Sequence, residues 1–186
     1  GTPTVYYGDE IGMVDVPIPP ERRLDPWSET LPHMGRDPCR TPMQWSGGPN
    51  AGFSPAWTPE PWLPLADDYE TVNVAGELEE PTSILNLYRC LLAYRKATPA
   101  LSVGRYKPVE GVPKSCYAFR RETDEQQVLV VLNFSGQEER LVIPSPNNAT
   151  IAISTYLDRT GGVDLLGLSL RSIEGVIIEL TEPERR

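Results

Sequence analysis

The chain has 186 residues, of which 39% are hydrophobic, and its formal net charge at pH 7 is -9. This acidic balance excludes nucleic acid as a partner, because nucleic-acid binding needs clustered lysine and arginine, and it disfavours an anionic membrane surface for the same reason. The three cysteines, Cys39, Cys90 and Cys116, have no paired spacing, and neither a signal peptide nor a spanning apolar run is recognisable, so we expect reduced thiols in a cytoplasmic protein without a membrane partner.

The first predicted element is a short β-strand over Thr2 to Tyr7, which is rich in β-branched and aromatic residues and stops at Gly8. Asp9 and Glu10 follow it. Adjacent residues at the end of a strand point to opposite sides, so these two carboxylates do not suit a reacting pair that must flank one bond. We expect them to act as turn and cap carboxylates instead.

The next segment, Val14 to Met34, is long and irregular and carries five prolines, with a helical turn expected near Glu21 to Arg23. Loops of this length in compact domains are usually functional or disordered. Trp27 and His33 are candidates for the rim of a ligand site, and the alternative for His33 is an exposed loop histidine. Because His33 is the only histidine, a two-histidine metal site is excluded, and we expect neither a metal nor a cofactor.

Gly35 to Trp45 (Gly-Arg-Asp-Pro-Cys-Arg-Thr-Pro-Met-Gln-Trp) contains two arginines four residues apart, Arg36 and Arg40, and a carboxylate, Asp37. Its two prolines forbid a continuous helix and reduce the freedom of the unfolded loop, which lowers the entropic cost of holding the arginines in place. A planar guanidinium offers five donors in fixed directions, which suits a rigid polyol or a carboxylate. The alternative is a proline-rich surface loop with an Asp37 ion pair.

Ser46 to Ala75 stays irregular, and its aromatic residues Phe53, Trp57 and Trp62 are expected to be packing anchors rather than platforms for a sugar. An amphipathic helix follows. Thr82 or Ser83 is its predicted cap, apolar residues recur at helical spacing from Ile84 to Leu92, and Lys96 and Pro99 mark its end. Nothing in this helix suggests chemistry.

Beyond Gly104 the hydrophobic period changes from helical spacing to two, which predicts short strands separated by turns. Strands at this spacing are typical of an antiparallel β-sandwich, and residues 104–182 are the part most suited to fold unaided. The predicted strands are Cys116–Phe119, Gln127–Phe134, Glu138–Ile143, Thr150–Ser154, Leu168–Leu170 and Gly175–Leu180.

Three segments in this order, Gly1 to Met13, Gly35 to Trp45 and Pro49 to Ser54, resemble the α-glucosidase branch of the α-amylase superfamily (glycoside hydrolase family thirteen). The resemblance continues through Pro61 to Leu65, the helix and the β-rich tail. It implies that residues 1–103 are the last strand, substrate loop and last helix of a (β/α)8 TIM barrel, and that residues 104–186 form an all-β C-terminal domain. The chain is therefore expected to be the C-terminal part of such an enzyme.

Retaining hydrolysis of a glycosidic bond needs a nucleophilic carboxylate and a protonated acid partner. The resemblance implies that both come from earlier barrel strands, and the motifs that carry them do not occur here. We therefore expect no catalytic carboxylate in this chain and no activity from it alone.

The resemblance assigns substrate recognition to this chain. Arg36 matches the arginine that holds the terminal glucose at its non-reducing end, Arg40 matches a second arginine near the leaving-group side, and Asp37 is expected to steady one of them by a charge-assisted bond. The sequence departs from the family pattern at Pro38 and Cys39, which puts the loop conformation in doubt but not the register of the arginines. The expected partner is a short oligosaccharide, maltose or isomalto-oligosaccharides.

Three alternatives stay open on these residues. An isomerase or transglucosylase of the trehalose or isomaltulose synthase type would keep the chemistry and change the product. A heavy chain of an amino-acid transporter would keep the fold without hydrolysis. A separate carbohydrate-binding module over residues 104–182 is disfavoured, because that part has no tryptophan.

Overall fold

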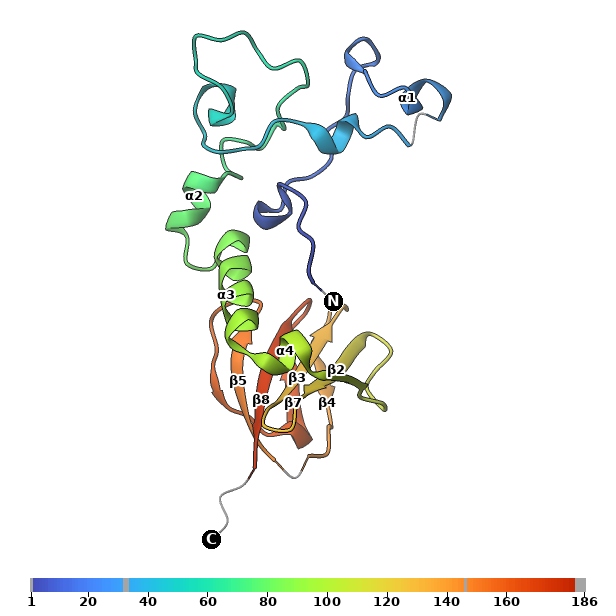
Figure 1. Cartoon of the computed structure of the whole chain (residues 1–186), viewed down its shortest axis with the longest axis vertical. Helices are drawn as coiled ribbons and strands as arrows, with labels where there is room; N and C mark the ends of the chain where they lie inside the picture. Colours follow the sequence, from blue (N-terminus) through green and yellow to red (C-terminus); the bar gives the residue numbers. More distant parts are fainter. Residues whose placement is uncertain (1, 32–33, 146, 183–186) are drawn as a thin grey trace. The chain divides into compact units, whose positions relative to one another are not determined.

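The computed structural model describes residues 2–31, 34–145 and 147–182 (Figure 1). The chain divides into two compact units, Pro3–Tyr88 and Arg89–Arg186 with Gly1–Thr2. The division falls within helix α3, whereas the sequence predicts a boundary at 103/104, which stays a prediction. The second unit, which contains the strands, is called the β unit.

Loops and short helices make up the unit Pro3–Tyr88. Asn73 caps helix α2 (Val74–Glu79), because its side chain accepts a hydrogen bond from the backbone N–H of Gly76 at 2.9 Å. The expected helical turn near Glu21 is present as a short 3-10 helix. The helices of this unit are α1 (Trp27–Thr30), α2 (Val74–Glu79) and 3-10 helices at Asp9–Ile11, Pro20–Arg22, Asp37–Arg40 and Pro49–Gly52.

The strand predicted at Thr2 to Tyr7 is not formed, and this prediction is wrong for the chain as described. A strand exists through backbone hydrogen bonds to a neighbouring strand. Within the described residues, no strand is paired with residues 2–6. The β-branched and aromatic composition is therefore present without the partner that would turn it into a strand.

The aromatic side chains of the loop after Ser46 are not the packing anchors expected from the sequence. Trp57 is 85% exposed, and Phe53 and Trp62 are each more than half exposed. The buried positions of this unit are taken by smaller or aliphatic residues. They include Ile11, Ile18, Met43, Ala51, Leu63 and Ala66.

Helix α3 (Ile84–Ala97) forms where the apolar spacing predicts it. The Ser83 hydroxyl accepts a hydrogen bond from the backbone N–H of Asn86 at 3.2 Å, which confirms the cap predicted at Thr82 or Ser83. Pro99 ends the helical run as expected and also starts a further short helix, α4 (Pro99–Val103), because proline is well suited to the first turn of a helix. Among the described residues, no helix has the length and hydropathy needed to cross a bilayer.

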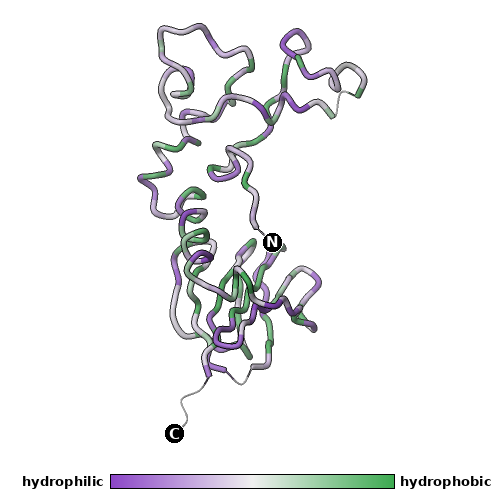
Figure 2. The backbone as a smooth tube through the Cα atoms, viewed as in Figure 1, coloured by the Kyte–Doolittle hydropathy of each residue, from purple (hydrophilic) through white to green (hydrophobic). Residues whose placement is uncertain are grey.

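The β unit contains a six-stranded antiparallel sheet in the order β1-β2-β3-β8-β5-β6 and a two-stranded sheet, β4-β7. Figure 2 shows hydrophobic segments along these strands. In the register of the large sheet, Phe119 lies opposite Val130, which lies opposite Ile177. The strands are β1 (Arg105–Pro108), β2 (Cys116–Glu122), β3 (Gln127–Asn133), β4 (Glu139–Leu141), β5 (Asn148–Ser154), β6 (Gly161–Gly162), β7 (Leu168–Leu170) and β8 (Gly175–Thr181).

All six predicted strands of this unit are confirmed, with ends that differ by up to three residues. Two strands were missed. β1 is short, contains Pro108 and is exposed along its length, so it lacks a hydrophobic pattern. β6 consists of Gly161 and Gly162, which the sequence indicates as a turn.

Alternate residues of the large sheet bury two different faces. Leu129 and Val131 of β3 pack with residues of β4 and β7, such as Leu141 and Leu168, in the main core. Val128 and Val130 point the other way and pack with Ala100 and Leu101 of α4 in a second core. This period-two division is the reason why the strand pattern was readable from sequence.

A group of charged side chains lies at the β7–β8 end of the β unit. The carboxylate of Glu174, whose side chain is fully buried, lies 3.0 Å from the Nε of Arg159 and 2.7 Å from the Nη2 of Arg171. Arg171 also forms a bidentate pair with Asp158, and its guanidinium stacks over the ring of Tyr156. Burial would raise the pKa of Glu174, but hydrogen bonds from the side chain and backbone of Arg171 outweigh it and lower that pKa.

Candidate functional site

The loop that carries the predicted site residues is held by two buried carboxylates, Asp25 and Asp37. Asp37 accepts hydrogen bonds from the backbone N–H groups of Leu24 at 2.8 Å and of Asp25 at 2.9 Å. Asp25 accepts from the backbone N–H groups of Arg36 at 2.9 Å and of Trp27 at 3.1 Å. Each acid therefore binds the backbone beside the other, and the loop between them is closed at its base.

Arg36 lies at this closure point with 56% of its side chain exposed. Its Nε donates to the Oδ2 of Asp25 at 3.0 Å. Within the part of the chain that the structure describes, the side-chain hydrogen bond of Arg36 is made by Nε and not by its two Nη groups. The predicted candidate Arg36 is thus placed on a fixed support with its donors at the surface.

The ionisation of this pair follows from its hydrogen bonds. The side-chain and backbone N–H groups of Arg36 and the backbone N–H of Trp27 lower the pKa of Asp25 to about 2. The same carboxylate raises the pKa of the Arg36 guanidinium. Both groups are therefore charged at neutral pH, and their charges cancel.

The expectation that Asp37 steadies an arginine needs correction. The side chain that binds Arg36 is Asp25, eleven residues earlier, while Asp37 accepts hydrogen bonds from the backbone N–H groups of Leu24 and Asp25. The reason is geometric, because Asp37 lies inside the 3-10 helix Asp37–Arg40 and its side chain is directed to the buried side of the loop. Its predicted contact with a substrate stays untested.

Arg40 is exposed at the end of the same 3-10 helix and lines a cavity of about 420 Å³. The Tyr7 hydroxyl donates to the carbonyl of Thr41 at 3.0 Å, which fixes one wall of this cavity. Burial raises the pKa of Tyr7, so the hydroxyl stays protonated as a donor. The other lining residues are Glu10, Pro42, Met43, Trp45, Phe53, Pro61, Trp62 and Leu63.

Asp9 and Glu10 act as turn carboxylates, as predicted. Asp9 accepts from the backbone N–H of Tyr6 at 3.0 Å, and Glu10 accepts from the backbone N–H of Gly8 at 2.8 Å. Gly8 has a φ of 95°, a conformation that glycine adopts without strain. These bonds shape the turn that carries Tyr7 and Glu10, two of the residues that line the cavity.

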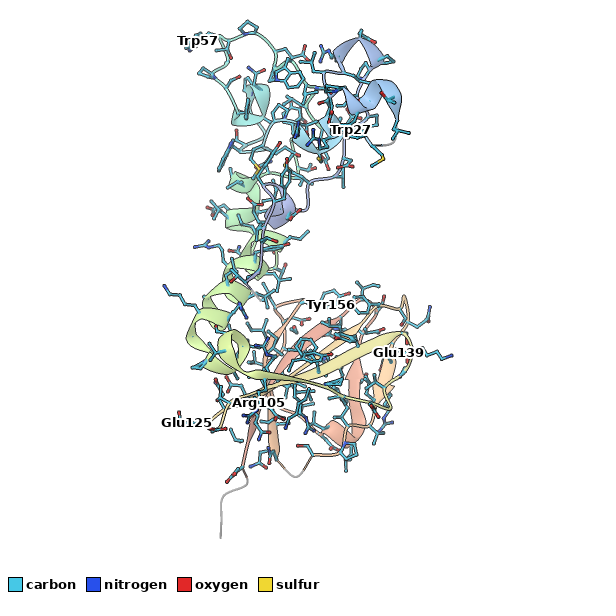
Figure 3. The ribbon with its side chains drawn as sticks, turned by 45° about the vertical axis from the view of Figure 1, so that its right-hand side comes forward. Trp27, Trp57, Arg105, Glu125, Glu139 and Tyr156 are labelled. Carbon is cyan, nitrogen blue, oxygen red and sulfur yellow. The ribbon has the colours of Figure 1, made fainter. Side chains whose placement is uncertain are left out.

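Two further residues, Trp27 and His33, were predicted at the rim of a ligand site. Trp27 is exposed on α1, and Figure 3 shows it in the same unit as Trp57. His33 lies outside the described residues. Among the residues that are described, no group of histidine, cysteine and acidic side chains is arranged to hold a metal ion.

Asp25 is the residue that sequence reasoning missed. Its own signal was present, since an aspartate before Pro26 commonly opens a turn, and its Oδ1 does accept from the backbone N–H two residues on. The pairing with Arg36 was not readable, because it joins residues eleven apart across an irregular loop.

Comparison with known proteins agrees with this architecture. The family model "Alpha amylase, catalytic domain" matches residues 1–104, and "Alpha-amylase SusG C-terminal domain" matches residues 116–170. The oligo-1,6-glucosidase of Parageobacillus thermoglucosidasius is 29% identical over 98% of this chain and 36% of its own length.

Two solved structures are similar in fold as well as in sequence. A Bacillus licheniformis trehalose-6-phosphate hydrolase mutant gives a TM-score of 0.83 at 27% identity, over 98% of this chain and 36% of that one. An isomaltulose synthase mutant from Erwinia rhapontici NX5, in complex with D-glucose, gives 0.82 at 26% identity, over 97% and 35%. The chain thus spans about a third of the length of these relatives, in their C-terminal part. It belongs to the α-amylase family, glycoside hydrolase family thirteen, with homologues of the α-glucosidase and oligo-1,6-glucosidase type.

Proposed function

We propose that this chain supplies the recognition of the terminal glucose in a retaining α-glucosidase that acts on the non-reducing end of short α-glucosides. The observation that carries the proposal is the support of Arg36: its Nε is bound to a buried carboxylate, while 56% of its side chain is exposed. A guanidinium held in this way donates to sugar hydroxyls at a low entropic cost. The nucleophile and the acid come from other parts of the enzyme, and this chain alone is inactive.

The cavity beside Arg40 suits the leaving-group side of the substrate. It combines one cationic and one acidic side chain, Arg40 and Glu10, with aromatic walls from Trp45, Phe53 and Trp62. Sugar-binding sites use polar groups for the hydroxyls and aromatic faces for the apolar faces of the ring. We assign Arg36 to the terminal glucose and Arg40 to the neighbouring unit, with Asp37 as a support of the loop.

Isomerisation is the second candidate, because one of the similar structures is an isomaltulose synthase with bound D-glucose. An isomerase would hold the terminal glucose by the same contacts and return it to the second sugar instead of to water. The two reactions are separated by their products. Protein expressed from the complete open reading frame should release glucose from maltose, and conversion of sucrose into an isomer without net hydrolysis would favour the isomerase.

The assignment of Arg36 is tested by substitution in the same protein. Arg36→Ala removes charged donors to the sugar and should cost about 1.5–3 kcal/mol of transition-state stabilisation. This corresponds to a roughly 10- to 150-fold lower kcat/KM on p-nitrophenyl α-glucoside. Arg22→Ala is the matched control, because Arg22 is on the same loop and pairs with Glu60 at the surface. Unchanged kinetics for Arg36→Ala would refute the proposal, and turnover by residues 1–186 alone would refute the absence of catalytic carboxylates.

A further inference from the structure

We infer that Asp25 is a positioning residue for Arg36, which aims the Nη groups at two neighbouring hydroxyls of the terminal sugar, and that Asp37 secures only the backbone of the loop. The inference rests on the proposed contact between Arg36 and the sugar. The inference gives different roles to Asp25 and Asp37, although the two carboxylates are alike in burial and in the number of backbone N–H groups that they bind.

The difference between the two acids lies in what each one touches. Oδ2 of Asp25 accepts from both the backbone N–H and the Nε of Arg36, so a single oxygen fixes the start and the end of that side chain. Oδ2 of Asp37 accepts from the backbone N–H groups of Leu24 and Asp25. Asp25 therefore restricts the rotamers of Arg36, whereas Asp37 restricts the chain that carries Asp25.

The closure of the loop fixes the backbone on either side of Arg36. A Cβ placed on the preceding residue, Gly35, would lie 2.2 Å from the Oγ of the buried Ser28, so the two ends of the loop meet there without room for a side chain. The backbone N–H of Val16 also donates to the carbonyl of Pro38 at 3.1 Å, just beyond the site. Arg36 thus starts from a fixed backbone.

The bond to Nε determines which donors remain. With Nε bound to Asp25, the guanidinium presents Nη1 and Nη2 as its free edge, two parallel donors in one plane. Such a pair matches two adjacent oxygens on a pyranose ring. Because Asp25 carries the charge opposite to that of Arg36, the pair is neutral overall, which suits a ligand of uncharged hydroxyl groups.

Glucose binding provides the test, since it needs no turnover. Dissociation constants are measured by calorimetry on protein from the complete open reading frame, for Arg36→Ala, Asp25→Asn, Asp37→Asn and the double variants with Arg36→Ala. Asp25→Asn should weaken glucose binding roughly three- to tenfold, the cost of immobilising a long side chain. In the Arg36→Ala background, Asp25→Asn should have no further effect, because the group it positions is gone.

Asp37→Asn is the matched control and should weaken glucose binding less than Asp25→Asn does, because the hydrogen bonds of Asp37 go to backbone N–H groups and not to the side chain of Arg36. If Asp25→Asn leaves affinity unchanged, or weakens it equally with and without Arg36, the inference is overturned. If Arg36→Ala itself leaves glucose binding unchanged, the proposed function fails first. If Asp25→Asn does not fold, Asp25→Glu replaces it, because this variant keeps the charge and shifts the carboxylate by one methylene. Asp25→Glu should then weaken glucose binding only when Arg36 is present.

Discussion

Glu174→Gln should destabilise the β unit selectively. Glu174 is the fully buried member of the charged group, and the substitution removes the anion that faces both Arg159 and Arg171. Removing one partner of a buried ion pair costs about 3–5 kcal/mol. The arginines keep 31% and 42% of their side chains exposed, and Arg171 still has Asp158, so we expect the lower end, about 3 kcal/mol.

The distribution of tryptophan gives an assay for each unit. All four tryptophans, Trp27, Trp45, Trp57 and Trp62, lie in the unit Pro3–Tyr88, so their fluorescence reports on that unit alone. Hydrogen exchange of peptides from β3 and β8 reports on the β unit. In urea, Glu174→Gln should lower the midpoint of the exchange transition by roughly 1–3 M for typical m-values and leave the fluorescence transition unchanged.

Glu125→Gln is the control for this experiment, because Glu125 is exposed in the turn between β2 and β3 and should change stability by less than about 0.5 kcal/mol. The effect of Glu174→Gln should also depend on pH. Since the folded-state pKa of Glu174 is lowered from 4.5, its contribution is present above that pH and is lost as the pH falls below it. A midpoint equal to that of Glu125→Gln at pH 7, or a shift in fluorescence alone, would refute the reasoning.

Two further predictions concern the unit Pro3–Tyr88. Because the pKa of Asp25 is lowered from 3.8 to about 2, the support of Arg36 should be lost as the pH falls through that interval. The loss should be seen as a smaller protection factor of the Arg36 amide in hydrogen exchange, and an unchanged protection factor down to pH 2 would contradict it. Limited proteolysis of residues 1–186 should cut first in the unit with the exposed Trp57 and Trp62, while the β unit survives, and equal resistance of both would contradict this.

The parts of the fold that were predictable are those in which a short repeat in sequence reports burial. Strands β3 and β8 alternate between two apolar faces, and helix α3 has a serine cap and a terminal proline, so local residues determine each of them. β1 was not predictable, since its residues are exposed and it is a strand only because Tyr106 and Lys107 lie opposite residues of β2. Thr2 to Tyr7 is the opposite case, with strand composition and no partner.

The sequence predicted the arginines of the candidate site but not the carboxylate that holds Arg36 in place. Arg36 and Arg40 were identified from a compact motif, and the structure places both at the surface of one loop. Asp37 was expected to pair with one of these two arginines, because sequence reasoning favours near neighbours. The observed partner, Asp25, depends on how an irregular, proline-rich segment folds back, and no periodic pattern records that.

The reciprocal bonds of Asp25 and Asp37 have a consequence for how this region can change. Because these bonds join the two ends of the loop directly, they hold Arg36 in position whatever residues lie in the middle of the loop. Segments of other lengths or compositions can be exchanged for the residues between Ser28 and Gly35 while Arg36 keeps its place. On the proposed role of Arg36, this loop is a place where sequence changes would alter the surroundings of the sugar and leave the arginine that binds it in position.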